Sequence, residues 1–212
     1  FAGGGRAAAG SVTELDIGGR AGIPGSAAAV MLNVTAVFPS GAWYLTVFPC
    51  GQPQPLASNV NVNPGTDVRA NLAVVPVADD GSSDVYLERV LNVAIDIVGY
   101  VTDSSAPASD AGRFHLVAPT REVDTRIGVG FAAFAGQDVR TLDPGIVPVI
   151  ASAVAQNLTM VRTGGRGFVT VYPGGQRPTV SSVNAAGAGQ IRGAFGAASL
   201  SATGVESVFS EA

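Results

Sequence analysis

The sequence contains no lysine, and all twelve of its basic residues are arginine. Without lysine, the chain cannot use Schiff-base catalysis, the lysine of a P-loop or a lysine–asparagine isopeptide crosslink. The arginines are scattered singly along a chain of net charge −4, so no basic stripe for a phosphate backbone is predicted. Nucleic acid is therefore not an expected partner.

Cysteine and histidine each occur once, as Cys50 and His115. One cysteine cannot form an intrachain disulfide or a thiolate metal cage, and one imidazole cannot assemble a zinc site alone. His115 lies in Arg113–Val117, a predicted strand, where a structural role is expected. No catalytic residue, metal or cofactor is predicted, because neither half of the sequence places a nucleophile, a base and an orienting group at a suggestive spacing.

Charged residues are also scarce. They make up 13% of the sequence, whereas 47% of the residues are apolar, and a charged share of roughly 25% is usual. Such a surface suits a packed or self-associated particle better than a freely soluble enzyme. No apolar run reaches the roughly 18 residues of a membrane span, so membrane insertion is not expected. The chain begins at Phe1 without a basic segment, and we expect that any signal peptide has been removed.

What the sequence does contain is a duplication. The matching segments are apolar strands that share no acid, base or ligand set, which favours architecture or binding over catalysis. The separation is 124 residues for the first two pairs and 123 for the last: Val30–Thr35 with Val154–Thr159, Leu45–Pro49 with Val169–Pro173, and Val85–Tyr86 with Val208–Phe209.

The duplication predicts two domains, residues 1–104 and 105–212, each lacking one end segment. Repeat 1 has no counterpart of Arg113–Arg126, and repeat 2 has no counterpart of Val90–Tyr100. Two explanations stay open. The chain is a piece of a longer array, or a strand from a neighbouring chain fills each gap, because an unpaired sheet edge is a template for strand addition.

Alternation of apolar and polar residues with period two predicts strands, and glycine and proline are too evenly spread for long helices. We therefore predict two tandem antiparallel β-sandwich or barrel-like modules, each missing an end strand. Only Ser26–Ala29 and Ala194–Ser199 leave room for a helical turn, and a linker is expected at Thr102–Gly112. The strands predicted in repeat 1 are Val12–Ile17, Ala28–Val37, Trp43–Phe48, Ala57–Val62, Val68–Val77, Asp84–Leu87 and Leu91–Val101.

A structural ion-pair cluster is predicted around Asp124, which is flanked by Arg121 and Arg126. Asp96 stands in the middle of an apolar strand, where a carboxylate is costly unless it is paired or faces solvent. We expect Asp96 to pair with an arginine of the Asp-Thr-Arg type, which would tie the first and last strands of one module together.

Three aromatic residues are candidate ligand or partner contacts: Trp43, Tyr44 and Tyr100. Flat aromatic faces stack on sugar rings, but core or rim packing is the favoured explanation, because repeat 2 has Gly167 and Phe168 where repeat 1 has Trp43 and Tyr44. Among metals, calcium has the best cluster, Asp79–Asp84, but the second repeat has no carboxylate at the equivalent place.

A further signal comes from five segments: Ile23–Thr35, Trp43–Gly51, Ala57–Asn61, Ile95–Tyr100 and Ala118–Arg126. Taken together, they resemble a tandem repeat of secreted actinobacterial proteins that is sometimes appended to cell-wall hydrolases. The resemblance implies an exported, non-catalytic all-β module and carries no activity with it. We therefore expect an extracellular structural or adhesive protein that packs with copies of itself or with neighbouring repeats. Binding of cell-wall glycan, as an accessory module of a hydrolase, is the alternative.

Overall fold

The structure is a computed structural model of the chain and describes residues 8–37, 41–63, 67–89, 92–109, 112–148 and 150–211. Across these residues every regular element is a β-strand, and the paired strands are antiparallel. The predicted all-β fold class is confirmed. Contacts divide the chain into unit 1, Phe1–Pro107, and unit 2, Ala108–Ala212; the division falls inside the segment predicted as a linker.

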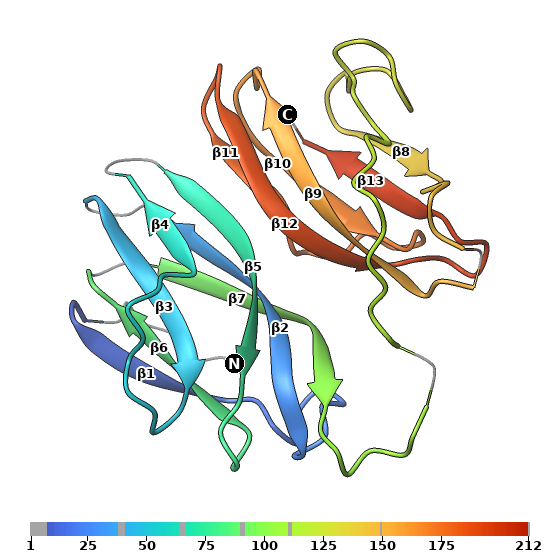
Figure 1. Cartoon of the computed structure of the whole chain (residues 1–212). Helices are drawn as coiled ribbons and strands as arrows, with labels where there is room; N and C mark the ends of the chain where they lie inside the picture. The colour runs from blue at the N-terminus through green and yellow to red at the C-terminus, as the bar shows by residue number, and fades with distance from the viewer. Residues whose placement is uncertain are drawn as a thin grey trace. The chain divides into compact units, whose positions relative to one another are not determined.

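Unit 1 folds into two facing sheets, with strand orders β1-β6-β3-β4 and β5-β2-β7 (Figure 1). The strands predicted for repeat 1 are confirmed with small changes at their ends. The largest change is at β4, which begins at Val60 rather than at Ala57. The strands are β1 Ser11–Asp16, β2 Ala27–Val37, β3 Trp43–Pro49, β4 Val60–Val62, β5 Val68–Pro76, β6 Ser82–Leu87 and β7 Asn92–Thr102.

The core of unit 1 lies between these sheets, and β2 is the central strand of its sheet. Val30, Leu32 and Val34 of β2 point inward and are completely buried. Because side chains alternate along a strand, Met31, Asn33 and Thr35 lie on the opposite face. Strand β7 covers the second edge of β2 and adds three partly buried apolar residues to the same core: Val93, Ile95 and Ile97.

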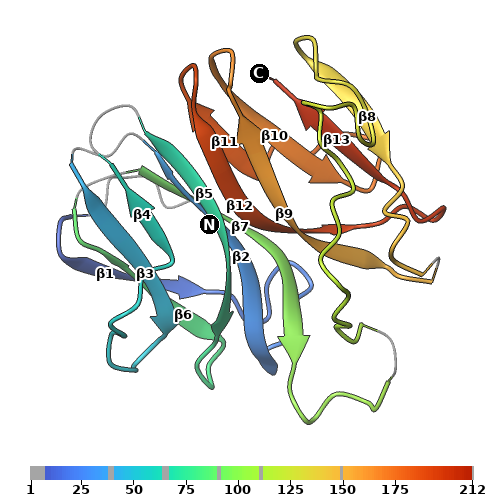
Figure 2. The ribbon, with the colours of Figure 1, turned by 45° about the horizontal axis from the view of Figure 1, so that its top comes forward.

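Unit 2 repeats this strand order. Its sheet β11-β10-β13-β8 (Figure 2) corresponds strand for strand to β4-β3-β6-β1, and its sheet β12-β9 corresponds to β5-β2. No strand among the residues described in unit 2 corresponds to β7. The strands are β8 Asp138–Leu142, β9 Ala153–Val161, β10 Arg166–Tyr172, β11 Val183–Ala186, β12 Ile191–Ser199 and β13 Glu206–Ser210.

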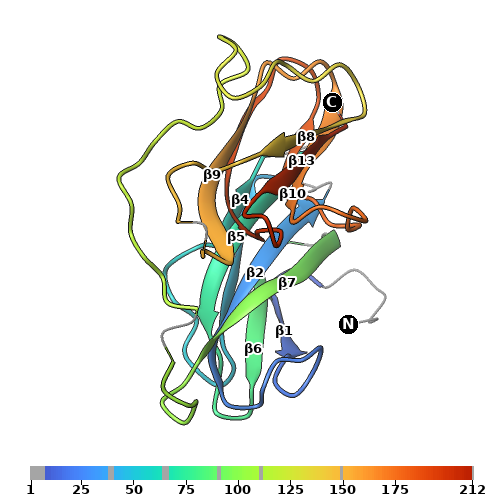
Figure 3. The same ribbon diagram turned by 90° about the vertical axis from the view of Figure 1, so that its right-hand side faces the viewer.

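The structure differs from the sequence pattern at three places. Ala194–Ser199, where the sequence leaves room for a helical turn, lies in β12, and Ser26–Ala29 runs into β2. Pairing with neighbouring strands outweighs the weak helical preference of these alanine-rich stretches. Arg113–Val117, expected as a strand, has no strand structure and is exposed throughout; Figure 3 shows this part of the chain as a long trace without arrows.

Candidate functional site

The feature that distinguishes unit 2 is one edge of β9, which we call the free edge. In unit 1, β2 has β5 on one side and β7 on the other, over registers of nine and ten residue pairs. In unit 2, the equivalent strand β9 pairs only with β12 among the residues described, from Ala153 to Val161 (Figures 1 and 3). An open edge of this length is a template for another strand.

The hydrogen-bond pattern identifies which residues of β9 face the free edge. The Leu200 N–H donates to the Ser152 C=O at 2.9 Å, directly before the paired register of β12 and β9. In an antiparallel pair the backbone groups of successive residues alternate between the two sides. The N–H and C=O groups of Ser152 and of every second residue after it therefore point to β12. The residues whose N–H and C=O point to the free edge are Ala153, Ala155, Asn157, Thr159 and Val161.

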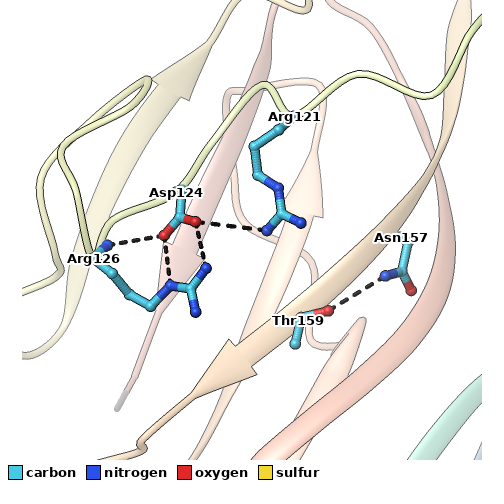
Figure 4. A network of polar contacts seen from close by, with 5 residues as sticks. All are labelled: Arg121, Asp124, Arg126, Asn157 and Thr159. Carbon is cyan, nitrogen blue, oxygen red and sulfur yellow. Dashed lines mark hydrogen bonds and ion pairs between the residues drawn. The ribbon is translucent and has the colours of Figure 1, made fainter.

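The outer face of β9 carries an exposed polar pair. The Asn157 side-chain amide donates to Thr159 Oγ1 at 3.3 Å (Figure 4), and both residues are exposed. Their counterparts in unit 1 are Asn33 and Thr35. Asn33 lies opposite Asp96 of β7, and its side chain is hydrogen-bonded to the Asp96 carboxylate.

Asp96 therefore pairs with an amide of its own unit. Burial raises the pKa of the Asp96 carboxyl, and the hydrogen bond with Asn33 acts in the opposite direction. The expected pairing of Asp96 with an Asp-Thr-Arg arginine remains a prediction. What the structure shows is a strand-to-strand pair between β2 and β7.

The predicted cluster of Arg121, Asp124 and Arg126 is formed within unit 2. Arg126 Nε lies 2.8 Å from Asp124 Oδ1 and Arg126 Nη2 lies 2.6 Å from Oδ2, while Arg121 Nη1 lies 3.7 Å from Oδ2 (Figure 4). The hydrogen bonds from Arg126 lower the pKa of Asp124 to about 2. A bidentate pair of this kind fixes geometry as well as charge.

The backbone around this cluster is a compact turn. Asp124 N–H donates to Val129 C=O at 3.0 Å, and Val129 N–H returns the bond to Asp124 at 3.1 Å. Gly130 has a φ of 75°, and a Cβ there would lie 2.6 Å from the Glu122 carbonyl oxygen. The cluster thus pins a turn that only glycine can close, which is a structural role.

Comparison with protein families, curated proteins and solved structures finds no match for this chain. The relation between its own two units is therefore the comparison that carries functional weight. The described residues contain no helix with the length and apolar character needed to cross a membrane.

The aromatic candidates separate into different environments. Trp43 is only 5% exposed and packs in the core of unit 1, whereas Tyr100, on β7, is 44% exposed. Tyr44 is half-buried and pairs with Tyr86 at 5.8 Å between ring centroids. Burial, followed by the neighbouring Tyr44 and Glu88, raises the pKa of Tyr86. A sugar-stacking surface on this sheet would thus use Tyr44 with Tyr86 rather than Trp43.

Unit 2 has an aromatic pair at the equivalent place, but with different residues and with an arginine over it. Phe168 and Phe209 lie 5.7 Å apart at the positions of Tyr44 and Tyr86. The guanidinium of Arg177 lies over this pair, 4.2 Å from the Phe209 ring centroid. The corresponding loop of repeat 1, Cys50–Ser58, contains no arginine. Only the unit 1 pair therefore combines two hydroxyls with aromatic rings that no arginine of its own loop covers.

A buried polar pair in unit 2 was missed by sequence reasoning. Glu206 is completely buried, and the Gln156 amide nitrogen lies 2.9 and 2.8 Å from its two carboxylate oxygens. Burial raises the pKa of Glu206, and the bond from Gln156 acts in the opposite direction. The signal was present in the repeats: unit 1 has Leu32 and Ser83 at these positions, so two neighbours changed together.

Among the residues described, no group of three or more histidine, cysteine or acidic side chains lies close enough to hold a metal ion. Asp80 instead accepts hydrogen bonds from the Ser82 N–H and hydroxyl, at 3.0 and 2.5 Å, and closes the turn before β6. His115 is exposed outside any strand, so its expected role as a strand residue is wrong.

Proposed function

We propose that this protein is a non-catalytic extracellular structural or adhesive β-repeat protein that associates with copies of itself or with neighbouring repeats by strand addition. The extracellular location rests on the resemblance described above. The mode of association rests on the free edge of β9.

The free edge of β9 supports the proposal because the equivalent strand of unit 1, β2, is paired on both sides. Every open sheet has edges, so an unpaired edge alone would not indicate association. In unit 1, however, the same strand position is covered on both sides, and β7 also contributes apolar residues to the core. Unit 2 pairs the equivalent strand on one side only, in the part of the chain that the structure describes.

The composition supports the same function. A surface that is poor in charge lacks the repulsion that keeps sheet edges apart, and proteins commonly protect such edges with lysine, of which this chain has none. Ala153 and Ala155 also point their backbone groups to the free edge. Their side chains are small and uncharged, so they present no obstacle to an incoming strand.

The test is the size distribution of the purified chain, measured by light scattering and electron microscopy of the same sample. Ala155→Pro removes an N–H that points to the free edge. A matched control is Ala202→Pro, in the exposed turn between β12 and β13. We expect ordered multimers of the native chain and of the control, and monomers of Ala155→Pro. A native chain that stays monomeric at high concentration would overturn the proposal.

A second candidate function is glycan binding, and the Tyr44–Tyr86 pair favours it. Two rings of one sheet lie side by side, and Tyr86 is hydrogen-bonded to Tyr44. Aromatic residues with one polar end suit a ligand that is both flat and hydroxylated. Retention on peptidoglycan or chitin should fall after Tyr44→Ala, with Phe168→Ala in unit 2 as the matched control. Unchanged retention of the Tyr44→Ala variant would contradict glycan binding at this pair.

A further inference from the structure

We propose that the free edge of β9 is a sequence-selective site for a strand of the β7 type: an extended segment in which one carboxylate, between aliphatic residues, lies opposite Asn157. This inference rests on the proposed assembly by strand addition and defines what the edge recognises. The occupant is a polypeptide strand with the chemistry of Asn92–Thr102, supplied by another repeat unit.

The register comes from unit 1. There, β7 runs antiparallel to β2 with Asp96 opposite Asn33, Ile95 opposite Val34 and Ile97 opposite Leu32. Moving this register by 124 residues places a carboxylate opposite Asn157 and two aliphatic side chains opposite Leu158 and Gln156. The backbone groups of Asn157 point to the free edge, so the incoming strand would meet both its amide and its side chain.

Two outer-face residues that would meet the strand are kept between the two units, whereas Leu32 of the inner face is not. Asn33 and Thr35 recur as Asn157 and Thr159, but Leu32 is replaced by Gln156. The kept asparagine has a different partner in each unit: in unit 1 it is bonded to Asp96, and in unit 2 it makes a 3.3 Å contact with Thr159. The exposed Asn157 amide is thus available to a stronger acceptor.

A carboxylate fits this position better than a neutral side chain. Hydrogen bonds to an ionised acceptor are roughly twice as strong as neutral ones, and cross-strand pairs contribute to the choice of partner. The aliphatic neighbours fit as well, because Leu158 is only partly buried against the core of unit 2. The strand would cover Leu158 as Ile95 covers the core of unit 1.

The experiment titrates the full chain with a fluorescent synthetic peptide of residues 92–102 and follows the anisotropy of the label. A second peptide carries Asp96→Asn. The protein is used as native chain, as Asn157→Asp, and as Ala155→Pro, which blocks the edge without changing Asn157. Circular dichroism establishes that each variant is folded.

The native chain should prefer the Asp96 peptide over the Asp96→Asn peptide by about tenfold, the usual worth of one hydrogen bond to a charged group. Asn157→Asp should reverse this preference, because two carboxylates would then face each other, and Ala155→Pro should bind neither peptide. Reversal by the exchanged pair is an effect that general loss of structure cannot produce.

Equal affinity for both peptides, with Ala155→Pro still blocking them, would overturn the pairing with Asn157 while leaving assembly by strand addition intact. A native chain that binds no peptide and stays monomeric would overturn both proposals. A native chain that assembles but binds no peptide would overturn the β7-type occupant alone.

Discussion

The pKa values of two carboxyl groups in unit 2 are shifted in opposite directions by their surroundings. Asp124 is held by the guanidinium of Arg126 on a turn, which lowers its pKa to about 2. Glu206 is enclosed between the sheets with the uncharged amide of Gln156, and burial raises its pKa. An amide supplies hydrogen-bond donors but no compensating charge, so ionised Glu206 is costly in the folded state.

Replacing Glu206 with glutamine should therefore stabilise unit 2 at neutral pH. The pKa of Glu206 is higher in the folded chain than its unfolded value of about 4.3. The contribution of Glu206 to the free energy of unfolding is thus fully present below the unfolded pKa and is lost as pH rises through the folded pKa. The free energy of unfolding of Glu206→Gln minus that of the native chain should rise by about 1.4 kcal/mol for each pH unit between these two pKa values.

Denaturant unfolding at several pH values between about 4 and 8 measures this difference. The comparison with Glu206→Gln cancels the opposite contribution of Asp124, whose stabilisation is lost as pH falls from about 3.9 towards about 2. A difference that does not change with pH would show that Glu206 stays in one protonation state over the range.

The turn held by Asp124 gives a second prediction at this scale. Gly128→Ala should cost about 1–2 kcal/mol of local stability, because its φ of 73° is left-handed but no other atom is near. Gly130→Ala should disturb the turn more, since its Cβ would meet the Glu122 carbonyl oxygen at 2.6 Å. Limited trypsin digestion after Arg126 should accelerate in the order native, Gly128→Ala, Gly130→Ala. Equal rates would contradict the role of the close contact.

Among the elements, period-two patterns predict where strands lie in the sequence, but they do not predict which strands pair with each other. Buried Val30, Leu32 and Val34 alternate with Met31, Asn33 and Thr35, and this pattern predicts β2 correctly. In Ala194–Ser199 small residues give no period, and only the pairing with β9 makes the segment a strand. The Gln156–Glu206 pair escaped prediction because the two residues are 50 positions apart.

The orientation of β9 gives a prediction at this scale. Ala155→Pro removes an N–H that points to the free edge and should change the free energy of unfolding of the monomer by less than about 1 kcal/mol. Val154→Pro removes an N–H that bonds to β12 and should cost about 1–3 kcal/mol, because its partner is left unsatisfied. Denaturant unfolding at low protein concentration compares them; the reverse order would show that the two sides of β9 are exchanged.

At the scale of the whole molecule, the two units differ in how much core they bury. In the described residues, unit 1 has one cluster of sixteen buried apolar side chains. Unit 2 has two smaller clusters, of four and three. Each fully buried aliphatic or aromatic side chain contributes about 1.5–3 kcal/mol, so the units should differ in stability even though they share a strand order.

Scanning calorimetry of the monomeric chain should therefore show two transitions, with unit 2 unfolding first. Ile95→Ala removes a side chain that β7 adds to the core of unit 1 and should lower only the second transition. Leu158→Ala should lower only the first. A single transition that both substitutions shift equally would contradict the independence of the two units.

Association by strand addition requires that the free edge of β9 pairs with another strand. Residue-resolved amide hydrogen exchange tests this pairing, in dilute monomer and in the concentrated, assembled sample. The amides of Ala155, Asn157 and Thr159 should exchange quickly in the monomer and become protected on assembly, while those of Val154 and Leu158, bonded to β12, should be protected in both. Edge-facing amides that still exchange quickly in the assembled sample would show that the free edge of β9 stays unpaired.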